Sequence, residues 1–375
     1  MPKEHIVSID PYRTLVEEPG TGHNRWHEAI EPVLEVEPGD TVAYETRDAF
    51  DGQLNSGSTD SDVGQLNLNV VHPLTGPVYV KGAEPGDLLE AHLVEIEADP
   101  WEQWGYTIEV PGFGFLRDEF PDPFIVHWRL HGNEYAESDQ LPGVRIRCTP
   151  HPGILGLAPS AELRQRATER EAELAERGGF VLPPDPTDAV PDEESVAQEA
   201  LRTIPPRETA GNIDIKQLSP GSTVLLPVYA DGGLVSTGDV HYAQGDCEAC
   251  GTALEIRSRV HVRFQLRKGE AERQSIRDLQ FFRDDYFTPP ELAAPRRFFA
   301  TTGISVHKDG RNEGEDLSVA ARNALLNMIE HLGTRGFDRQ QAYALCSVAV
   351  DLRINQTVDV PNPLVSALLP LDIFM

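Results

Sequence analysis

The chain has 375 residues, 39% of them hydrophobic and 25% charged, and it carries a net charge of −29 at pH 7. An apolar share of this size can fill one large core, as a single elaborate domain or as two closely packed ones. The negative charge argues against nucleic acid and anionic membrane surfaces as partners, because both bind through Lys and Arg. No apolar run approaches the roughly 20 residues that span a bilayer, and residues 1–5 lack the apolar stretch of a secretory signal. We therefore expect a cytoplasmic protein.

The acidic residues are spread along the chain rather than gathered in a tail, which is typical of a solvated surface. We interpret this as adaptation to high salt, because molar salt shortens the Debye length to about 3 Å and screens such a surface. The chain has four cysteines, Cys148, Cys247, Cys250 and Cys346. In a cytosolic chain of this length we expect no disulfide framework.

Residues 1–159 are predicted to form a mainly β half. Runs at 41–46, 78–80 and 88–96 are short and bounded by turn residues, and 30 prolines and 31 glycines favour a sandwich or a barrel over a helical bundle. Residues 99–132 carry many aromatic side chains among glycines and prolines. We expect these to cap the core or an oligomer interface rather than to cover a pocket.

Residues 160–210 are predicted to be a charged helix followed by an excursion. The helix covers 160–178, with Ser160 as its N-cap, and 180–208 is rich in proline and acidic residues, which is typical of a surface linker.

Residues 211–375 are predicted to hold a β core and C-terminal helices that pack on a sheet. Strands are expected at 224–228, 254–262 and 263–266. Apolar residues at helical spacing predict a helix over 316–332, with Asp316 as cap and Gly333 as stop, and a second helix over 338–350. We expect residues 1–375 to form one unit.

The chemistry concentrates in residues 238–256, which read Gly-Asp-Val-His-Tyr-Ala-Gln-Gly-Asp-Cys-Glu-Ala-Cys-Gly-Thr-Ala-Leu-Glu-Ile. Two-residue spacing predicts that Asp239 and His241 point the same way on a strand, and that Asp246 and Glu248 do so after it. Imidazole and carboxylate are ligands that zinc accepts, with a position left open for water at a catalytic site. The alternative for Asp239 and His241 is a hydrogen bond within a structural turn.

Asp246 and Glu248 could be general acid and base, because two nearby carboxylates repel and one tends to keep its proton. They could also be further metal ligands or belong to a solvated turn. Backbone amides around Gly245 or Gly251 could stabilise an oxyanion. Cys250 could be a nucleophile or a packed thiol. The Cys247–Cys250 pair lacks the second cysteine pair of a structural zinc site and the βαβ context of a redox site.

This run resembles the signature of the acetamidase/formamidase family, approximately Gly-Asp-x-His-x-x-Gln-Gly-Asp-Gly-Glu-x-Cys-Gly-Thr-Ala-x-Glu. The matching residues are Gly238, Asp239, His241, Gln244, Gly245, Asp246, Glu248, Cys250, Gly251, Thr252, Ala253 and Glu255. Cys247 stands where the family usually has glycine. Segments 75–87, 151–159 and 211–214 are similar to further family segments, so that the resemblance spans most of the chain.

The resemblance implies a mainly β protein, a jelly-roll-like β-sandwich joined to a smaller α/β part, and a homo-oligomer. The implied activity is hydrolysis of formamide or acetamide to carboxylate and ammonia with a divalent metal, zinc or alternatively calcium, that activates water. Asp48, Asp239 and His241 are the expected metal ligands. Four further residues are expected to bind or orient the substrate, and they are Gln53, Asn212, Asp214 and Gln244. His72 is one more candidate.

Two other functions remain open from the sequence. One is an amidase with Cys250 as nucleophile, and the other is a non-catalytic, metal-containing protein that binds small solutes. A nucleotide-binding protein is not supported, because no glycine-rich phosphate loop precedes a predicted helix. The chain also lacks the Gly-x-Ser-x-Gly elbow of serine hydrolases.

Overall fold

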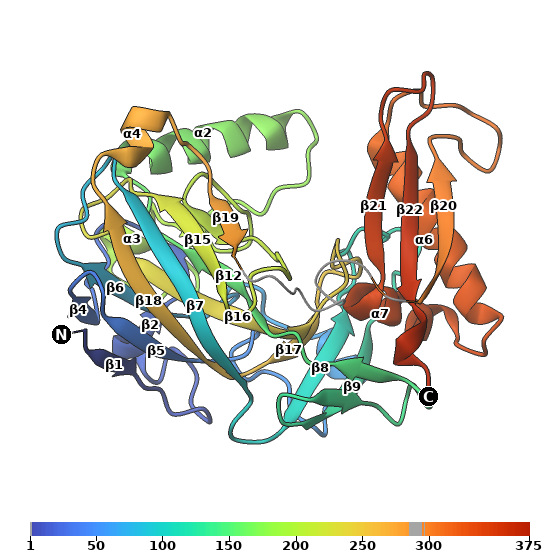
Figure 1. Ribbon diagram of the computed structural model, residues 1–375, viewed down its shortest axis with the longest axis horizontal. Helices are drawn as coiled ribbons and strands as arrows, with labels where there is room; N and C mark the ends of the chain where they lie inside the picture. Colours follow the sequence, from blue (N-terminus) through green and yellow to red (C-terminus); the bar gives the residue numbers. More distant parts are fainter. Residues whose placement is uncertain (1, 285–294, 296) are drawn as a thin grey trace.

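The computed structural model describes residues 2–284, 295 and 297–375, and two large sheets dominate it (Figure 1). The first sheet has six strands in the order β1, β5, β18, β7, β15 and β19. Its strands are β1 (Glu4–Val7), β5 (Thr41–Thr46), β18 (Ser258–Arg267), β7 (Leu88–Ala98), β15 (Ser222–Pro227) and β19 (Gln280–Arg283). The pair β1–β5 is parallel, and the other neighbours are antiparallel.

The second sheet carries the candidate site at its centre. Its main path runs β11, β10, β9, β8, β17, β16, β12 and β14, while β6 also pairs with β16 and holds β2 and β4. The strands are β11 (Arg145–Arg147), β10 (Tyr135–Glu137), β9 (Phe124–His131), β8 (Trp104–Glu109), β17 (Leu254–Ile256), β16 (Val235–Ala243), β12 (His151–Gly156), β14 (Ala210–Asn212), β6 (Leu74–Val80), β2 (Gly22–His23) and β4 (Leu34–Val36).

One continuous apolar cluster fills the space between the two sheets. It includes Val42 and Tyr44 of β5, Leu89 and Leu93 of β7, and Val240 of β16, all fully shielded from solvent. Burial of this kind is the main favourable contribution to folding. The site strand β16 is buried along its whole length, which is why its polar residues need partners inside the protein.

The excursion after β12 wraps back over the sheets. It contains α2 (Ala161–Glu176), α3 (Glu194–Ala197) and β13 (Leu201–Arg202), and β13 pairs with β3 (Arg25–Trp26). Buried Arg25 donates to the carbonyls of Asp185 and Thr187, and Arg202 donates to that of Pro183. These charge-assisted bonds fix a proline-rich segment that makes few ladder bonds of its own.

The C-terminal part stands beside the sandwich in Figure 1. The helices α6 (Leu317–Gly333) and α7 (Arg339–Ala349) pack with the three-stranded sheet β20 (Phe298–Ile304), β22 (Leu364–Pro370) and β21 (Asp351–Gln356). Helix α7 also contacts β8 and β9, and so links this part to the site sheet. The short elements α1 (Asp60–Val63), α4 (Glu270–Gln274), η1 (Pro19–Thr21) and η2 (Leu371–Ile373) complete the described chain.

The expected mainly β fold with helices is confirmed; the jelly-roll connectivity and the division into 1–159, 160–210 and 211–375 stay predictions. Helices α2 and α6 begin after Ser160 and Asp316 as expected, because these side chains accept the backbone N–H of the third helical residue. The break expected between 262 and 263 was wrong. The strand instead breaks at Arg257, where the chain leaves the second sheet as β17 and enters the first as β18.

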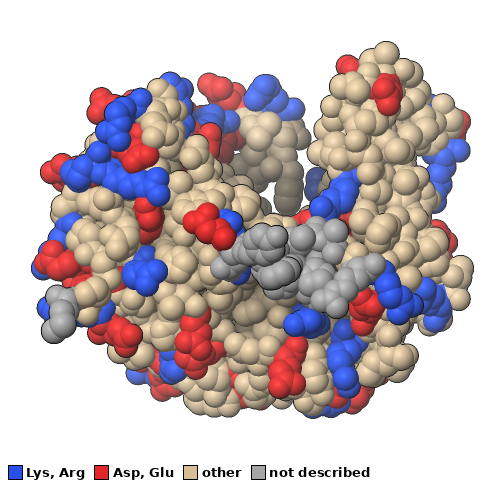
Figure 2. Space-filling view, viewed as in Figure 1, with Lys and Arg blue, Asp and Glu red and all other residues tan. Residues whose placement is uncertain are grey.

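The surface mixes both signs of charge. Figure 2 shows acidic side chains spread over the visible face, with Lys and Arg between them. Among the described residues, no helix has the length and apolarity to cross a bilayer.

Candidate metal centre and active site

His241 lies near the C-terminal end of β16 and is 0% exposed. Its cross-strand neighbours are His151 on β12 and Glu255 on β17. Gly153 on β12 leaves room for the ring, since a Cβ at that position would lie 2.7 Å from His241 Cε1. The imidazole therefore fits only because the residue beside it on β12 is a glycine, which has no side chain.

Three carboxylates surround the Nε2 atom of His241. The distances from Nε2 are 3.4 Å to Glu255 Oε2, 3.5 Å to Asp239 Oδ1 and 3.7 Å to Glu248 Oε1. Asp214 joins the same cluster, because the groups Asp214–Asp239–His241 and His241–Glu248–Glu255 each bring three ligand atoms within 4.8 Å of one another.

The cluster has the chemistry of a cation site. His241 Nε2, Glu255 Oε2 and Asp214 Oδ1 are buried and make no hydrogen bond, although unsatisfied buried polar atoms are costly. Two ligands about 2.1 Å from a tetrahedral zinc lie about 3.4 Å apart, close to the observed spacings. A divalent cation held by His241, Asp239, Glu255 and Asp214 would satisfy all three atoms, and with Glu248 in place of Asp214 it would satisfy the first two.

Without a cation the cluster holds protons. Burial raises the pKa values of Glu248 and Glu255 well above their usual range, and raises that of Asp214 to about 7. Burial alone would lower the pKa of His241, but the charges of Glu255 and Asp239 raise it well above its ordinary value. Burial likewise opposes ionisation of Asp239, and His72 and His241 nevertheless lower its pKa. A cation binding here displaces protons.

Gln244 orients His241 from outside the cluster. Its Nε2 donates to the carbonyl of Asp214 at 2.7 Å, which directs Oε1 toward the histidines. Oε1 lies 2.9 Å from His241 Nδ1 and 3.1 Å from His151 Nε2. Because an amide oxygen only accepts, the network assigns a proton to His241 Nδ1 and leaves the lone pair of Nε2 for a cation.

Asp48 lies beside this cluster rather than in it. Its Oδ1 accepts the hydroxyl of Tyr106 at 2.6 Å, and its carboxylate also accepts the backbone N–H groups of Phe50 and Gly52. Asp48, Tyr106 and Glu255 line one cavity of about 180 Å³. Neither ligand group found among the described residues includes Asp48.

Asp246 and Glu248 do not point the same way, so that expectation was wrong. Cys247 and Glu248 have φ values of 106° and 47°, which turn the chain between the two carboxyl groups. The backbone N–H of Asp246 donates to Asp351 on β21, and its carboxylate lies 3.7 Å from Arg353. Glu248 is thus the member of the pair beside His241.

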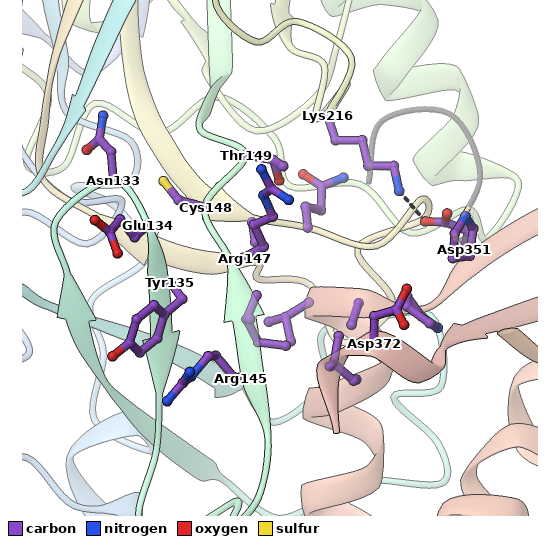
Figure 3. A pocket seen from close by; sticks show the side chains of 18 residues that line it. Asn133, Glu134, Tyr135, Arg145, Arg147, Cys148, Thr149, Lys216, Asp351 and Asp372 are labelled. Atoms are coloured by element: carbon purple, nitrogen blue, oxygen red, sulfur yellow. Dashed lines mark hydrogen bonds and ion pairs between the residues drawn. The ribbon is translucent and has the colours of Figure 1, made fainter. Parts of the chain in front are cut away.

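Lys216 and Asp351 lie at the boundary between the sandwich and the C-terminal part. They form a buried ion pair, drawn as the dashed line in Figure 3. The cavity around them has a volume of about 610 Å³ and also touches Gln244. Gln244, the hydrogen-bond partner of His241 Nδ1, therefore lies on the wall of this cavity.

The Cys250 thiol is packed in the core. Its Sγ lies 3.4 Å from the carbonyl of Ile108, and burial raises its pKa to about 12. The thiolate is the nucleophilic form, so that this placement favours a packed thiol.

Two further predicted residues lie outside the cluster. Gln53 braces a loop, with Nε2 donating to the carbonyls of Phe50 and Asn67. Asn212 donates to the carbonyl of Ile204, and its Oδ1 is buried without a partner.

The site residues that sequence reasoning did not assign include Glu255 and Tyr106. Glu255 was visible as a charged residue inside an apolar strand, Ala-Leu-Glu-Ile, and a buried carboxylate there needs a partner. Tyr106 had no such signal, since a Tyr within a strand is ordinary.

Fold and site together define a mainly β protein with a buried histidine–carboxylate cluster that can hold a divalent cation. Residues 8–375 match the Acetamidase/Formamidase family. The chain belongs to this family of amidohydrolases.

Relatives cover nearly the whole chain. The formamidase of Methylophilus methylotrophus is 35% identical, over 98% of this chain and 93% of that protein. The acetamidase of Mycolicibacterium smegmatis is 34% identical, over 91% of this chain and 89% of that protein. The solved structure of a gamma lactamase from Delftia acidovorans superposes with a TM-score of 0.93 at 36% identity, covering 99% of this chain and 93% of that one.

Proposed function

We propose that this protein hydrolyses short aliphatic amides, formamide or acetamide, to carboxylate and ammonia. The observation that carries the proposal is the buried cluster around His241, whose Nε2 faces three carboxylates without a hydrogen bond. The relatives named formamidase and acetamidase support the substrate class.

We propose zinc as the cation, because an imidazole nitrogen combined with carboxylate oxygens is a ligand set found at catalytic zinc sites. Calcium is the alternative, because most of the ligand atoms are carboxylate oxygens. His241, Asp239 and Glu255 would hold it. When bound, such a cation supplies Lewis acidity and lowers the pKa of water at the site toward 7.

Glu248 is the proposed general base. Its side chain is 16% exposed, whereas those of His241 and Glu255 are 0% and 2% exposed, so that Glu248 is more accessible to water and substrate than these two. It takes the proton of the attacking water as the C–O bond forms, and returns it to nitrogen as the C–N bond breaks and ammonia leaves.

A small substrate is supported by the cavity that reaches Glu255. At about 180 Å³ it is below the range of roughly 300–1,000 Å³ typical of drug-sized ligands. Tyr106 and Asp48 on its wall offer a hydroxyl and a carboxylate to a polar amide.

The test measures ammonia release from formamide, acetamide and propionamide after chelation and after reloading with single metals. His241→Ala should lose both activity and metal, while the control His261→Ala, whose ring pairs with Glu97 on the other sheet, should keep both. Retention of metal and turnover by His241→Ala would refute the assignment.

Two outcomes would support the alternatives. Loss of turnover in Cys250→Ser with metal retained would favour the Cys250 nucleophile. Saturable amide binding by the metal-loaded protein without ammonia release would favour a binding protein. We also propose a homo-oligomer, which sedimentation measurements would test.

A further inference from the structure

Two histidines, His72 and His241, face Asp239 from different segments. The Nδ1 atom of each ring has a different hydrogen-bond partner. His241 Nδ1 faces an amide oxygen of Gln244, as described above. His72 Nε2 lies 3.9 Å from Asp239 Oδ2, and its Nδ1 lies 3.3 Å from the hydroxyl of Thr203. An amide oxygen can only accept a hydrogen bond, whereas a hydroxyl can also donate one.

The hydrogen bonds of Thr203 determine which way that contact runs. Thr203 Oγ1 accepts the backbone N–H of His72 at 2.6 Å, and its own hydroxyl proton then needs an acceptor, because the residue is 0% exposed. Across residues 2–284, 295 and 297–375, His72 Nδ1 is the one acceptor found for it. Thr203 therefore donates to Nδ1, and the ring proton of His72 lies on Nε2.

The Nε2–H group of His72 is directed toward Asp239 in the cluster, and it has no hydrogen-bond partner among the described residues. The 3.9 Å to Asp239 is too long for a hydrogen bond, and the His72 side chain is 11% exposed. With a cation in place of the Nε2 proton of His241, the two histidines are held as opposite tautomers. His241 then presents a lone pair and His72 presents a donor.

A hydrogen-bond donor at this place would stabilise the charge that develops on the substrate oxygen. The backbone N–H groups of Gly245 and Gly251, which the sequence offered for an oxyanion, donate instead to the carbonyls of Ser347 and Glu248. Neither amide is free to stabilise charge on a substrate oxygen.

We propose that His72 is a catalytic residue that donates its Nε2–H to the carbonyl oxygen of the amide, and that Thr203 is the positioning residue that keeps the proton on Nε2. As water adds to the carbonyl carbon, the carbonyl electron pair moves to oxygen and the hydrogen bond from His72 strengthens. The proton stays on Nε2 throughout, while Glu248 carries the proton of the water.

The excursion over 180–208 positions Thr203 beside His72. Thr203 follows Arg202, whose guanidinium donates to the carbonyls of Pro183 and Leu68 and to the side chain of Asn69. The excursion is thereby bound to the segment just before His72. It holds the Thr203 hydroxyl against the ring.

The inference rests on the proposed function, and metal binding separates the two. His72→Ala should bind metal with the wild-type stoichiometry and an affinity within about twofold of wild type, whereas His241→Ala loses the metal. The kcat of His72→Ala should fall about 10²- to 10³-fold, as for loss of one oxyanion donor, with little change in KM. His72→Gln, which keeps an N–H near the Nε2 position, should recover part of this loss.

Thr203 is tested by a matched pair. Thr203→Val removes the hydroxyl at similar volume and should lower kcat, and Thr203→Ser should restore it. Long-range ¹H–¹⁵N NMR spectra of histidine-labelled protein should show Nε2–H for His72 in wild type and in Thr203→Ser, and a shift toward Nδ1–H in Thr203→Val.

Three results would overturn the inference. Metal loss in His72→Ala like that of His241→Ala would make His72 a ligand, an Nδ1–H signal for His72 would remove its donor, and unchanged kcat in His72→Ala would remove its catalytic role. If wild-type protein released no ammonia, the proposed function would fall and the donor role of His72 in turnover with it, while metal binding and the NMR spectra would still show whether His72 presents an N–H to the cluster.

Discussion

Gly153→Ala tests whether the space for His241 determines the site. The new Cβ would lie 2.6 Å from the carbonyl oxygen of Asp239, and 2.7 Å and 2.8 Å from Cε1 and Nε2 of His241. Ordinary contacts begin near 3.4 Å, so the ring and β16 must move by about 0.7 Å. The backbone of Gly153 is not left-handed, and the effect is therefore steric.

A displacement of this size has a calculable cost. Misplacing a reacting group by about 1 Å can cost about 10² in rate, and overpacking a core costs about 1–3 kcal/mol of stability. We expect kcat/KM for amide hydrolysis to fall about 10²-fold, together with weaker metal binding. The assays are ammonia release, metal content after dialysis and thermal melting.

The matched control is Gly20→Ala, because a Cβ at exposed Gly20 meets nothing within 4 Å. It should leave activity and metal content unchanged. Full metal content and turnover within about twofold of wild type in Gly153→Ala would refute the steric reasoning.

Four further predictions concern Gln244, the protons of the cluster, the backbone at Cys247 and the surface charge. Gln244→Leu removes the acceptor at His241 Nδ1 and should weaken metal binding about 10- to 100-fold in chelator competition; unchanged affinity would contradict the orienting role. The cluster around His241 should stabilise metal-free protein less at pH 8 than at pH 5.5, while the lowered pKa values of buried His23, His72 and His151 act in the opposite direction. Burial raises the pKa of Asp214 to about 7 against about 3.9 for an unfolded Asp, so the folded state holds the extra proton at pH 5.5 and loses that stability as pH rises through 7. The raised pKa values of Glu248, Glu255 and His241 act in the same direction as that of Asp214. Zinc should therefore raise the melting temperature more at pH 8 than at pH 5.5, because fewer protons must leave the cluster. An equal rise at both pH values would argue that zinc displaces no protons. Cys247→Gly should melt no lower than wild type and above Cys247→Ala, since φ is 106° at this position, and the reverse order would rule out strain there. Melting temperature should rise from low salt to molar KCl if the charge of −29 is an adaptation to salt, and a constant value would argue against it.

Local sequence patterns account for much of the fold. Ser160 and Asp316 cap their helices as expected, because N-capping depends on residues within one turn. Asp239 and His241 do lie close together, with 3.5 Å between Oδ1 and Nε2, but Asp239 has a φ of 52°, so that regular strand alternation alone does not account for the contact.

Local spacing was insufficient where long-range contacts and loop conformation set the direction. Asp246 and Glu248 share the spacing of Asp239 and His241, but positive φ values at Cys247 and Glu248 separate them. The contact of the Asp246 N–H with Asp351, 105 residues further along the chain, holds the loop in that form.

The family, the mainly β character, the helix caps and the motif that carries His241 could be predicted from the chain, because each depends on residues that are neighbours in sequence. The carboxylates around His241 and the partner of each histidine could not, because they depend on tertiary contacts. Glu255 reaches His241 through the pairing of β17 with β16, and Thr203 reaches His72 across 131 residues. Such contacts depend on strand register and on the path of the excursion, which arise only when the whole core packs.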